Sequence, residues 1–222
     1  MIKLFELLAA AVSVASFAYG ALVLLKKEVP KYFQLYVCAA GCYMLEELWV
    51  IVNSLFGNGL QDGLVTVRLI GFFGCLCFML SANANEFDKL VDEGQDKKAK
   101  ALALIAPAIL LVFFAFYALS PEKTGTDIEA FVGLLSMSPA LFASYFSLKH
   151  LFLSEDALGL LKTTKTINIL ALVFYGANYV YPLLSIHSSQ VIMSIYDIPL
   201  GVMLFSIVVA CRKGVLKWKT RI

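Results

Sequence analysis

The chain has 222 residues, of which 60% are hydrophobic and 15% are charged. A soluble domain averages about 25% charged and about 45–50% apolar residues, so this composition excludes an ordinary soluble fold and makes lipid the solvent for most of the chain. The net charge of +2 is too small to indicate nucleic-acid binding.

Seven segments are long and apolar enough to cross a bilayer, which takes about 20 residues of helix. Short polar connections such as "FGNGLQDG" and "SPEKTGTD" join them and leave no room for a soluble domain. The sequence therefore predicts an all-α polytopic membrane protein, a single seven-helix membrane domain over residues 1–222. The expected spans are residues 4–25, 32–56, 63–86, 101–120, 128–148, 166–187 and 190–211.

The first segment has some features of a signal peptide, with small residues around "ASFAYGA". Its apolar run exceeds the about 7–15 residues of a typical signal-peptide core. We therefore interpret it as an uncleaved first span.

Orientation follows from the lysines and arginines, which gather in cytoplasmic loops. Fifteen of the 18 fall on one side of the predicted topology, in the first, third and fifth loops and the C-terminal tail. The other side holds Lys3 and Lys123, and Arg68 lies inside a span. This predicts an outside N-terminus, a cytoplasmic C-terminus and a multi-pass protein of the cell membrane.

The two longer inner loops are amphipathic. Residues 86–100 carry both charge signs and are expected to extend the third helix into water, whereas residues 148–165 could lie on the membrane surface. Either loop could contact a cytoplasmic protein partner, although a solvated helix end is the simpler interpretation. The sequence leaves the oligomeric state open.

No metal site or other cofactor is expected. His150 and His187 fall at opposite membrane faces in this topology, so they cannot share a metal. The cysteines all lie in apolar runs, where a role as small packing residues is the simplest interpretation. They are Cys38, Cys42, Cys75, Cys77 and Cys211.

Four strongly charged residues lie within apolar spans: Glu46, Glu47, Arg68 and Asp197. A charge at the bilayer centre costs at least about 2.5–3.5 kcal/mol, so such residues normally face the bundle, pair with each other or line a water-filled cavity. All four fall in the outer half of the predicted bundle, where three acids face one base. Desolvation is expected to keep at least one carboxyl protonated, which leaves a group that can bind or release a proton.

Polar and aromatic side chains share helix faces with these charges, at spacings of three and four residues. Together they predict a pocket for a small polar or aromatic solute. The competing interpretation is a buried polar network that fixes helix packing. The candidate ligand-binding residues are Glu46, Glu47, Trp49, Asn53, Arg68, Tyr175, Asn178, Tyr179, Tyr196 and Asp197.

Two other patterns concern helix shape. Each of the last four spans contains a proline, which removes a backbone hydrogen bond and favours a kink. Gly71 and Gly74 in the third span predict close packing against a neighbouring helix. The prolines are Pro107, Pro139, Pro182 and Pro199.

Similar segments recur in the two halves of the chain. "ASFAYGALVLLKKE" in the first span is similar to "ASYFSLKHLFLSE" in the fifth, and the third span runs parallel to the seventh, so that Arg68 and Asp197 occupy comparable places. Such a repeat implies three helices, a linker helix and three more helices, with a binding site between the halves.

This layout resembles two kinds of protein, the small seven-helix solute carriers and the microbial rhodopsins. Arg68, Tyr181-Pro182 and Asp197 stand where rhodopsins carry an arginine, a Tyr-Pro pair and an aspartate. The seventh span holds no lysine, so retinal cannot form its Schiff base there. The Pro-Gln motif of the sugar facilitators is also absent.

Three functions remain for such a bundle. The first is a small transporter or facilitator, in which a polar solute enters the pocket from outside and a protonatable carboxylate couples its movement to a proton. The second is a seven-helix sensor or receptor-like protein that signals through a separate cytoplasmic partner. An intramembrane enzyme is the weakest hypothesis, because no Ser-His, His-rich or Asp-pair arrangement suits hydrolysis, and we expect no enzymatic activity.

Overall fold

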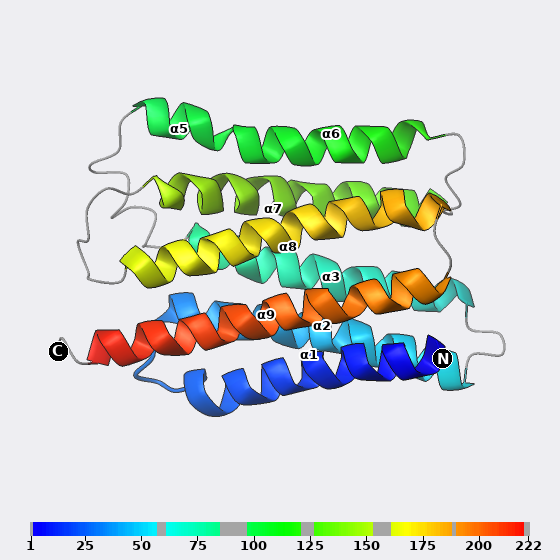
Figure 1. Cartoon of the computed structure of the whole chain (residues 1–222), viewed down its shortest axis with the longest axis horizontal. Coiled ribbons are helices and arrows are strands. Elements are labelled where there is room, and N and C mark those ends of the chain that lie inside the picture. The colour runs from blue at the N-terminus through cyan, green and yellow to red at the C-terminus, as the bar shows by residue number, and fades with distance from the viewer. Residues whose placement is uncertain are drawn as a thin grey trace.

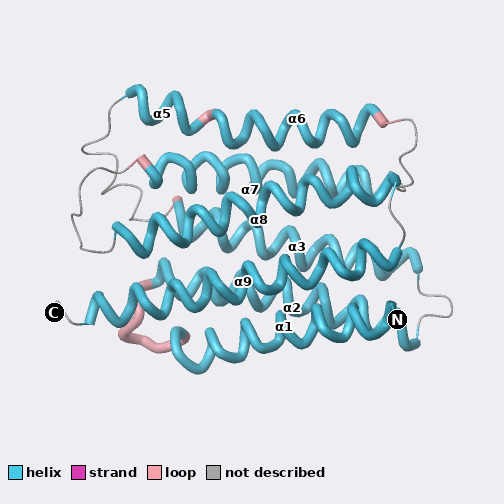
Figure 2. Tube along the Cα trace, in the orientation of Figure 1, coloured by secondary structure: helices cyan, strands magenta, loops and turns pink. Residues whose placement is uncertain are grey.

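The computed structural model describes residues 2–56, 61–84, 97–120, 127–152, 161–187 and 190–219, and these parts of the chain are helical with short turns and no strand (Figures 1 and 2). The helices are α1 (Ile2–Leu24), α2 (Lys31–Phe56), α3 (Gln61–Asn83), α5 (Lys97–Ala103), α6 (Ile105–Leu119), α7 (Asp127–Leu151), α8 (Leu161–His187) and α9 (Gln190–Lys219).

Each predicted span overlaps helix, but the fourth is divided between α5 and α6, and the end of the third, residues 85–86, lies outside the described residues. The largest difference in a helix boundary lies in α9. That helix runs to Lys219, well past the predicted end at residue 211. Its last turns bury Cys211, Gly214 and Val215 at spacings of three and four, and they expose Arg212 and Lys213. An amphipathic pattern of this kind continues the helix after the purely apolar run has ended.

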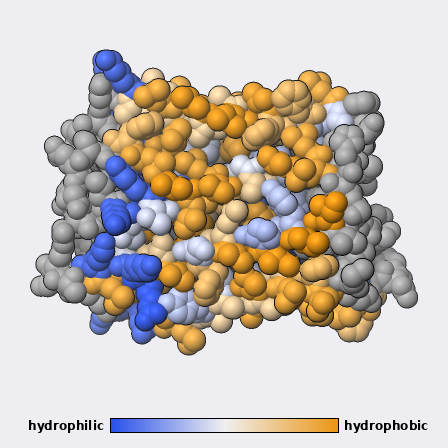
Figure 3. Space-filling model, in the orientation of Figure 1, coloured by the Kyte–Doolittle hydropathy of each residue, from blue (hydrophilic) through white to orange (hydrophobic). Residues whose placement is uncertain are grey.

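Four stretches of helix are long and apolar enough to cross a membrane, within the residues that the structure describes. They are Leu4–Leu24, Lys31–Asn53, Lys97–Leu119 and Ile195–Lys217. Hydrophobic residues cover most of the face of the bundle between its two ends that Figure 3 shows. These features are compatible with a membrane location.

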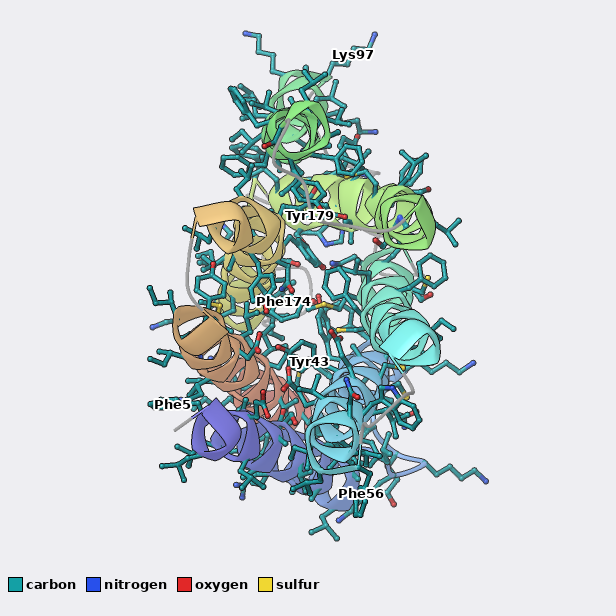
Figure 4. All side chains as sticks on the ribbon, turned by 90° about the vertical axis from the view of Figure 1, so that its right-hand side faces the viewer. Phe5, Tyr43, Phe56, Lys97, Phe174 and Tyr179 are labelled. Atoms are coloured by element: carbon teal, nitrogen blue, oxygen red, sulfur yellow. The ribbon has the colours of Figure 1, made fainter. Side chains whose placement is uncertain are left out.

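Six helices form a ring in the order α1, α2, α3, α7, α8 and α9, with α9 returning to α1. The helix α6 lies outside this ring against α7 and α8, as the end-on view shows (Figure 4). Only 11% of the apolar window in Lys97–Leu119 is buried within the protein, and Phe116 is 65% exposed. The first three and the last three helices therefore each supply half of the ring, and the helix between them in sequence stays at the edge.

A short break separates α5 from α6. Proline has no N–H to donate to the carbonyl four residues earlier, and its ring clashes with that carbonyl. Pro107 stands four residues after Ala103, where α5 ends. The proline thus accounts for an interruption at Leu104 within an otherwise continuous apolar segment.

The two ends of the bundle differ in charge. We call one the lysine end, where α2, α5 and α8 begin and α1, α3, α7 and α9 end (Figure 1). The hydrophilic surface gathers at this end (Figure 3). We call the other the amino-terminal end, where α1 begins. Described basic residues at the lysine end include Lys26, Lys27, Lys31, Lys97, Lys98, Lys100, Lys162, Lys165, Arg212, Lys213 and Lys217.

At the lysine end, a side chain holds the turn between α1 and α2. The Gln34 amide nitrogen donates to the carbonyl oxygens of Lys26 (2.7 Å) and Val29 (3.0 Å). Pro30 precedes the first residue of α2, a place where its missing N–H costs the helix nothing. The turn is therefore fixed without a long loop.

Candidate functional site

Three carboxylates are buried in the interior. Glu46 is 7% exposed and Glu47 is 2% exposed, both on α2, and Asp197 on α9 is 6% exposed. All three lie nearer the amino-terminal end of the bundle than the lysine end. A carboxylate gives up much hydration when it leaves water, so three in one half of a bundle are an expensive arrangement that is normally tied to function.

Glu46 stands at the contact between α2 and α3. A Cβ added to Gly71 would lie 2.9 Å from the Cβ of Glu46 and 3.0 Å from the carbonyl oxygen of Cys42. The predicted close packing at Gly71 and Gly74 is thus confirmed, because only a missing side chain allows α2 to approach so near. Arg68 lies one turn before Gly71 on α3, and its side chain is outside the described part of the structure.

Glu47 shares a face of α2 with Tyr43, one turn earlier. The Tyr43 ring packs edge-on against Phe174 of α8, with centroids 5.8 Å apart. Figure 4 shows Tyr43, Phe174 and Tyr179 pointing toward the middle of the ring, from opposite sides. This face of α2 therefore looks across the interior toward α8.

Asp197 lies where α9 meets two other helices. Its neighbour Tyr196 donates a hydrogen bond to the carbonyl oxygen of Ala177 on α8 (3.1 Å). One turn later, Gly201 packs against Ala9 and Val12 of α1. The aspartate is thus held at the junction of α1, α8 and α9.

The candidate residues of α8 divide between different partners. The Asn178 amide donates to the carbonyl oxygen of Phe174 in its own helix (2.9 Å), and Tyr179 donates to the carbonyl oxygen of Ser136 on α7 (3.3 Å). The hydroxyl of Tyr175 is buried and has no hydrogen-bond partner among the described residues. Asn178 and Tyr179 therefore serve their own helix or the contact with α7 as well as the interior.

Trp49 and Asn53, the remaining candidates on α2, are half-buried. The indole nitrogen of Trp49 is buried and has no hydrogen-bond acceptor among the described residues. An N–H without a partner at the border of the interior is free to donate to a bound molecule.

A second polar group lies at the lysine end, and the sequence did not single it out as a unit. The Tyr36 hydroxyl donates to Oδ1 of Asn83 (3.3 Å), and Nδ2 of Asn83 donates to Oγ of Ser147 (3.0 Å). All three side chains are fully buried, and they join α2, α3 and α7. We call them the hydroxyl–amide network.

The spacing of residues on α2 indicates one side of this network. Tyr36, Tyr43 and Glu47 stand at i, i+7 and i+11 on α2, which places them on one face. The partners Asn83 and Ser147 come from helices far apart in sequence, so no local pattern could pair them with Tyr36.

Polar side chains thus follow the interior from one end to the other. The carboxylates occupy one half and the hydroxyl–amide network the other. Further buried polar residues lie along α7 and α8. His150 is fully buried in the last turn of α7, whereas His187 ends α8 at the opposite end of the bundle. The further buried polar residues are Ser136, Ser144, Lys149, Thr163, Thr164 and Asn168.

Comparison of the chain with models of protein families, with curated proteins and with solved structures gave no match.

Proposed function

We propose that this protein is a small integral membrane transporter or facilitator with seven spans, and that it binds a small polar solute near the buried carboxylates. In the proposed topology the lysine end faces the cytoplasm and the N-terminus lies outside, which follows the positive-inside rule. The loops are short, so a separate output domain has no place within the bundle.

Within the described residues, α7 and α8 are not among the four stretches that are long and apolar enough to span a membrane, and their polar residues supply a specific reason. Their polar residues face inward: Ser136, Ser147 and Asn168 are all buried. Membrane helices carry such residues on faces that meet other helices or a solute, and not on the face that meets lipid. Buried polar residues therefore lower the average hydropathy of a helix without preventing it from spanning.

The observation that carries the proposal is the burial of Glu46, Glu47 and Asp197 in one half of an interior that stays polar to the other end. A group that served packing alone would be replaced at less cost by a neutral one. The carboxylates come from both halves of the ring, which suits a site between two halves that move relative to each other. One of them would exchange a proton with the medium as the solute moves.

The test is uptake by proteoliposomes of a panel of small polar solutes, with and without a pH gradient. The protein variants are Glu46→Gln, Glu47→Gln and Asp197→Asn, and Glu28→Gln is the control because Glu28 is exposed at the lysine end. We expect each interior variant to reduce uptake and the control to behave as the wild type. If all three interior variants kept uptake and solute binding, the carboxylates would be structural.

The same experiment separates transport from the alternative of a seven-helix sensor. A sensor would bind a member of the panel, with the affinity reduced by the carboxylate variants, yet the proteoliposomes would accumulate none of it. Its signal would then pass to a separate cytoplasmic partner at the lysine end.

A further inference from the structure

Near the lysine end, α1 and α9 are joined by a contact between a cation and an aromatic ring. The Arg212 guanidinium of α9 donates a hydrogen bond to the Tyr19 hydroxyl of α1, and its central carbon lies 5.5 Å from the centroid of the Tyr19 ring. The same ring packs against Phe205 on α9, with centroids 5.7 Å apart. A cation within about 6 Å of an aromatic ring is attracted to it. Tyr19 therefore holds the Arg212 side chain against α1.

The backbone beside this contact is closely packed. A Cβ added to Gly20, the residue after Tyr19, would lie 3.0 Å from side-chain atoms of Val208 on α9 and of Val37 on α2. Helices that approach so closely have little room to slide against each other. The guanidinium of Arg212 thus has a defined position at the contact between α1 and α9.

Tyr19 and Arg212 also lie at the same depth in their spans. Tyr19 is five residues before the end of Leu4–Leu24, and Arg212 is five residues before the end of Ile195–Lys217. At a rise of about 1.5 Å per residue, both are about 7–8 Å from the end of the span. Tyrosines gather at the border between headgroups and acyl chains, and long basic side chains reach from there to the headgroups.

Exposed leucines flank the pair. Leu22 follows Tyr19 by three residues and is 76% exposed, and Leu216 follows Arg212 by four residues and is 55% exposed. Because α1 and α9 both end at the lysine end, these leucines lie closer to that end than the pair does. Large apolar side chains exposed at this level favour contact with lipid over contact with water. The anion nearest to Arg212 in a membrane is therefore a lipid headgroup.

Positive charge dominates the surface around the pair. Hydrophilic residues gather over the last turns of α9 on the face that Figure 3 shows. Among the described residues at the ends of α1 and α9 and in the turn after α1, the exposed acid is Glu28, whereas four basic side chains besides Arg212 are exposed. These four are Lys26, Lys27, Lys213 and Lys217. We call Tyr19, Arg212 and the four lysines the α1–α9 basic face.

We infer that the α1–α9 basic face binds the headgroup of an anionic phospholipid, with the Arg212 guanidinium on its phosphate and Tyr19 as the positioning residue. Arginine presents its N–H donors in a planar fork that matches phosphate oxygens, and the Tyr19 hydroxyl occupies one of these donors. A zwitterionic headgroup would bring its own ammonium group near the lysines. The excess of basic residues therefore favours a headgroup without an amine, such as that of phosphatidylglycerol.

This inference depends on the membrane location of the bundle and not on transport, so its test measures lipid binding alone. The purified full-length protein in a nonionic detergent is unfolded thermally with phosphatidylglycerol, phosphatidylcholine or inorganic phosphate at the same concentration. The quantity compared is the extra rise in the unfolding midpoint with phosphatidylglycerol over that with phosphatidylcholine. A molecule that binds the folded state raises this midpoint. We expect the extra rise in the wild type, and no rise with inorganic phosphate.

Two double variants remove the same charge from different places at the lysine end. The variant of the site carries Arg212→Gln and Lys213→Gln, and its matched control carries Lys162→Gln and Lys165→Gln at the start of α8. We expect the first to lose most of the extra rise and the control to keep it. The inference is wrong if the wild type shows no extra rise, if inorganic phosphate reproduces it, if the variant of the site keeps it, or if both variants lose it equally.

A milder variant protects the test against misfolding of the double variant. Tyr19→Phe keeps the ring beside Arg212 and removes only the hydroxyl that accepts its hydrogen bond. Because the extra rise compares two lipids on the same protein, a change in overall stability does not enter it. We expect a partial loss, smaller than that of the double variant. A Tyr19→Phe protein with the full extra rise would mean that the guanidinium needs no fixed position, and would overturn the site.

Discussion

The two halves of the interior bury polar groups in different ways. Near the amino-terminal end, Glu46, Glu47 and Asp197 bury three acidic groups. Near the lysine end, Tyr36, Asn83 and Ser147 are neutral and satisfy one another through two hydrogen bonds between side chains. One half concentrates acidic groups, and the other closes a neutral network across three helices.

From this difference we expect the carboxylates to serve function and the hydroxyl–amide network to serve stability. A closed neutral network in a membrane bundle stabilises helix contacts at little electrostatic cost. Buried carboxylates are costly even when they are paired, so their retention points to a role in binding or proton exchange. Variants of the first half are therefore expected to change transport, and variants of the second half to change stability.

The largest expected effect is on uptake. Glu47→Gln should reduce uptake about tenfold to a hundredfold, because a hydrogen bond to a charged group contributes about 1.5–3 kcal/mol. Tyr36→Phe, at the same face of α2, should leave uptake within about fivefold of the wild type because it removes less than about 1 kcal/mol from a neutral network. Initial rates of uptake by proteoliposomes measure both effects. Equal losses of uptake in the two variants would contradict a difference in role between the two halves of the interior.

The next effect concerns the helix contact that supports the carboxylates. Gly71→Ala would place a methyl group 2.9 Å from the Glu46 Cβ and 3.0 Å from a backbone oxygen, so α2 and α3 must separate. We expect a loss of about 1–3 kcal/mol in the free energy of unfolding, measured by denaturation in detergent.

Gly176→Ala is the matched control for that measurement. Nothing lies within 4 Å of a Cβ added to Gly176, and it also sits inside a helix. It should be neutral or slightly stabilising, since alanine favours the helix more than glycine does. A Gly71→Ala protein as stable as Gly176→Ala would show that the contact has room to relax.

A comparable loss of stability is expected in the other half. Asn83→Leu leaves the Tyr36 hydroxyl and the Ser147 hydroxyl without the partner that joins them, which costs about 1–3 kcal/mol. Thermal unfolding in detergent measures it. Ser81→Ala is the control on the same helix, because that exposed hydroxyl bonds only to the carbonyl of Cys77. Equal stability of the two variants would mean that the network contributes nothing.

The smallest effect belongs to the contact that places Asp197. Tyr196→Phe removes one hydrogen bond to Ala177 and should lower the free energy of unfolding by about 0.5–1.5 kcal/mol. Tyr145→Phe should have less effect, since the Tyr145 hydroxyl has no hydrogen bond within the described residues. Denaturation in detergent compares the pair, and a larger loss for Tyr145→Phe would contradict the assignment.

Sequence patterns predicted some contacts and missed others. Gly71 and Gly74 indicated a close helix contact, because a missing side chain has one simple packing consequence. Asn83 was visible only as a polar residue near a helix end, since its partners stand 47 and 64 residues away. Asn168 carried no signal in its neighbourhood, and only the fold shows that it is buried without a hydrogen-bond partner among the described residues.

The sequence by itself determined that the chain is helical and approximately where the helices lie, because apolar runs of about 20 residues, prolines and flanking lysines act locally along the chain. It also placed Glu46, Glu47 and Asp197 in the interior, since a carboxylate within an apolar run has few alternatives. The tertiary structure alone decided that α6 stays outside the ring, that Tyr36, Asn83 and Ser147 meet, and that Asn168 has no hydrogen-bond partner among the described residues. Those outcomes depend on which helix faces which, and apolar helices of similar length can pack in many orders until close contacts and hydrogen bonds between distant residues select one.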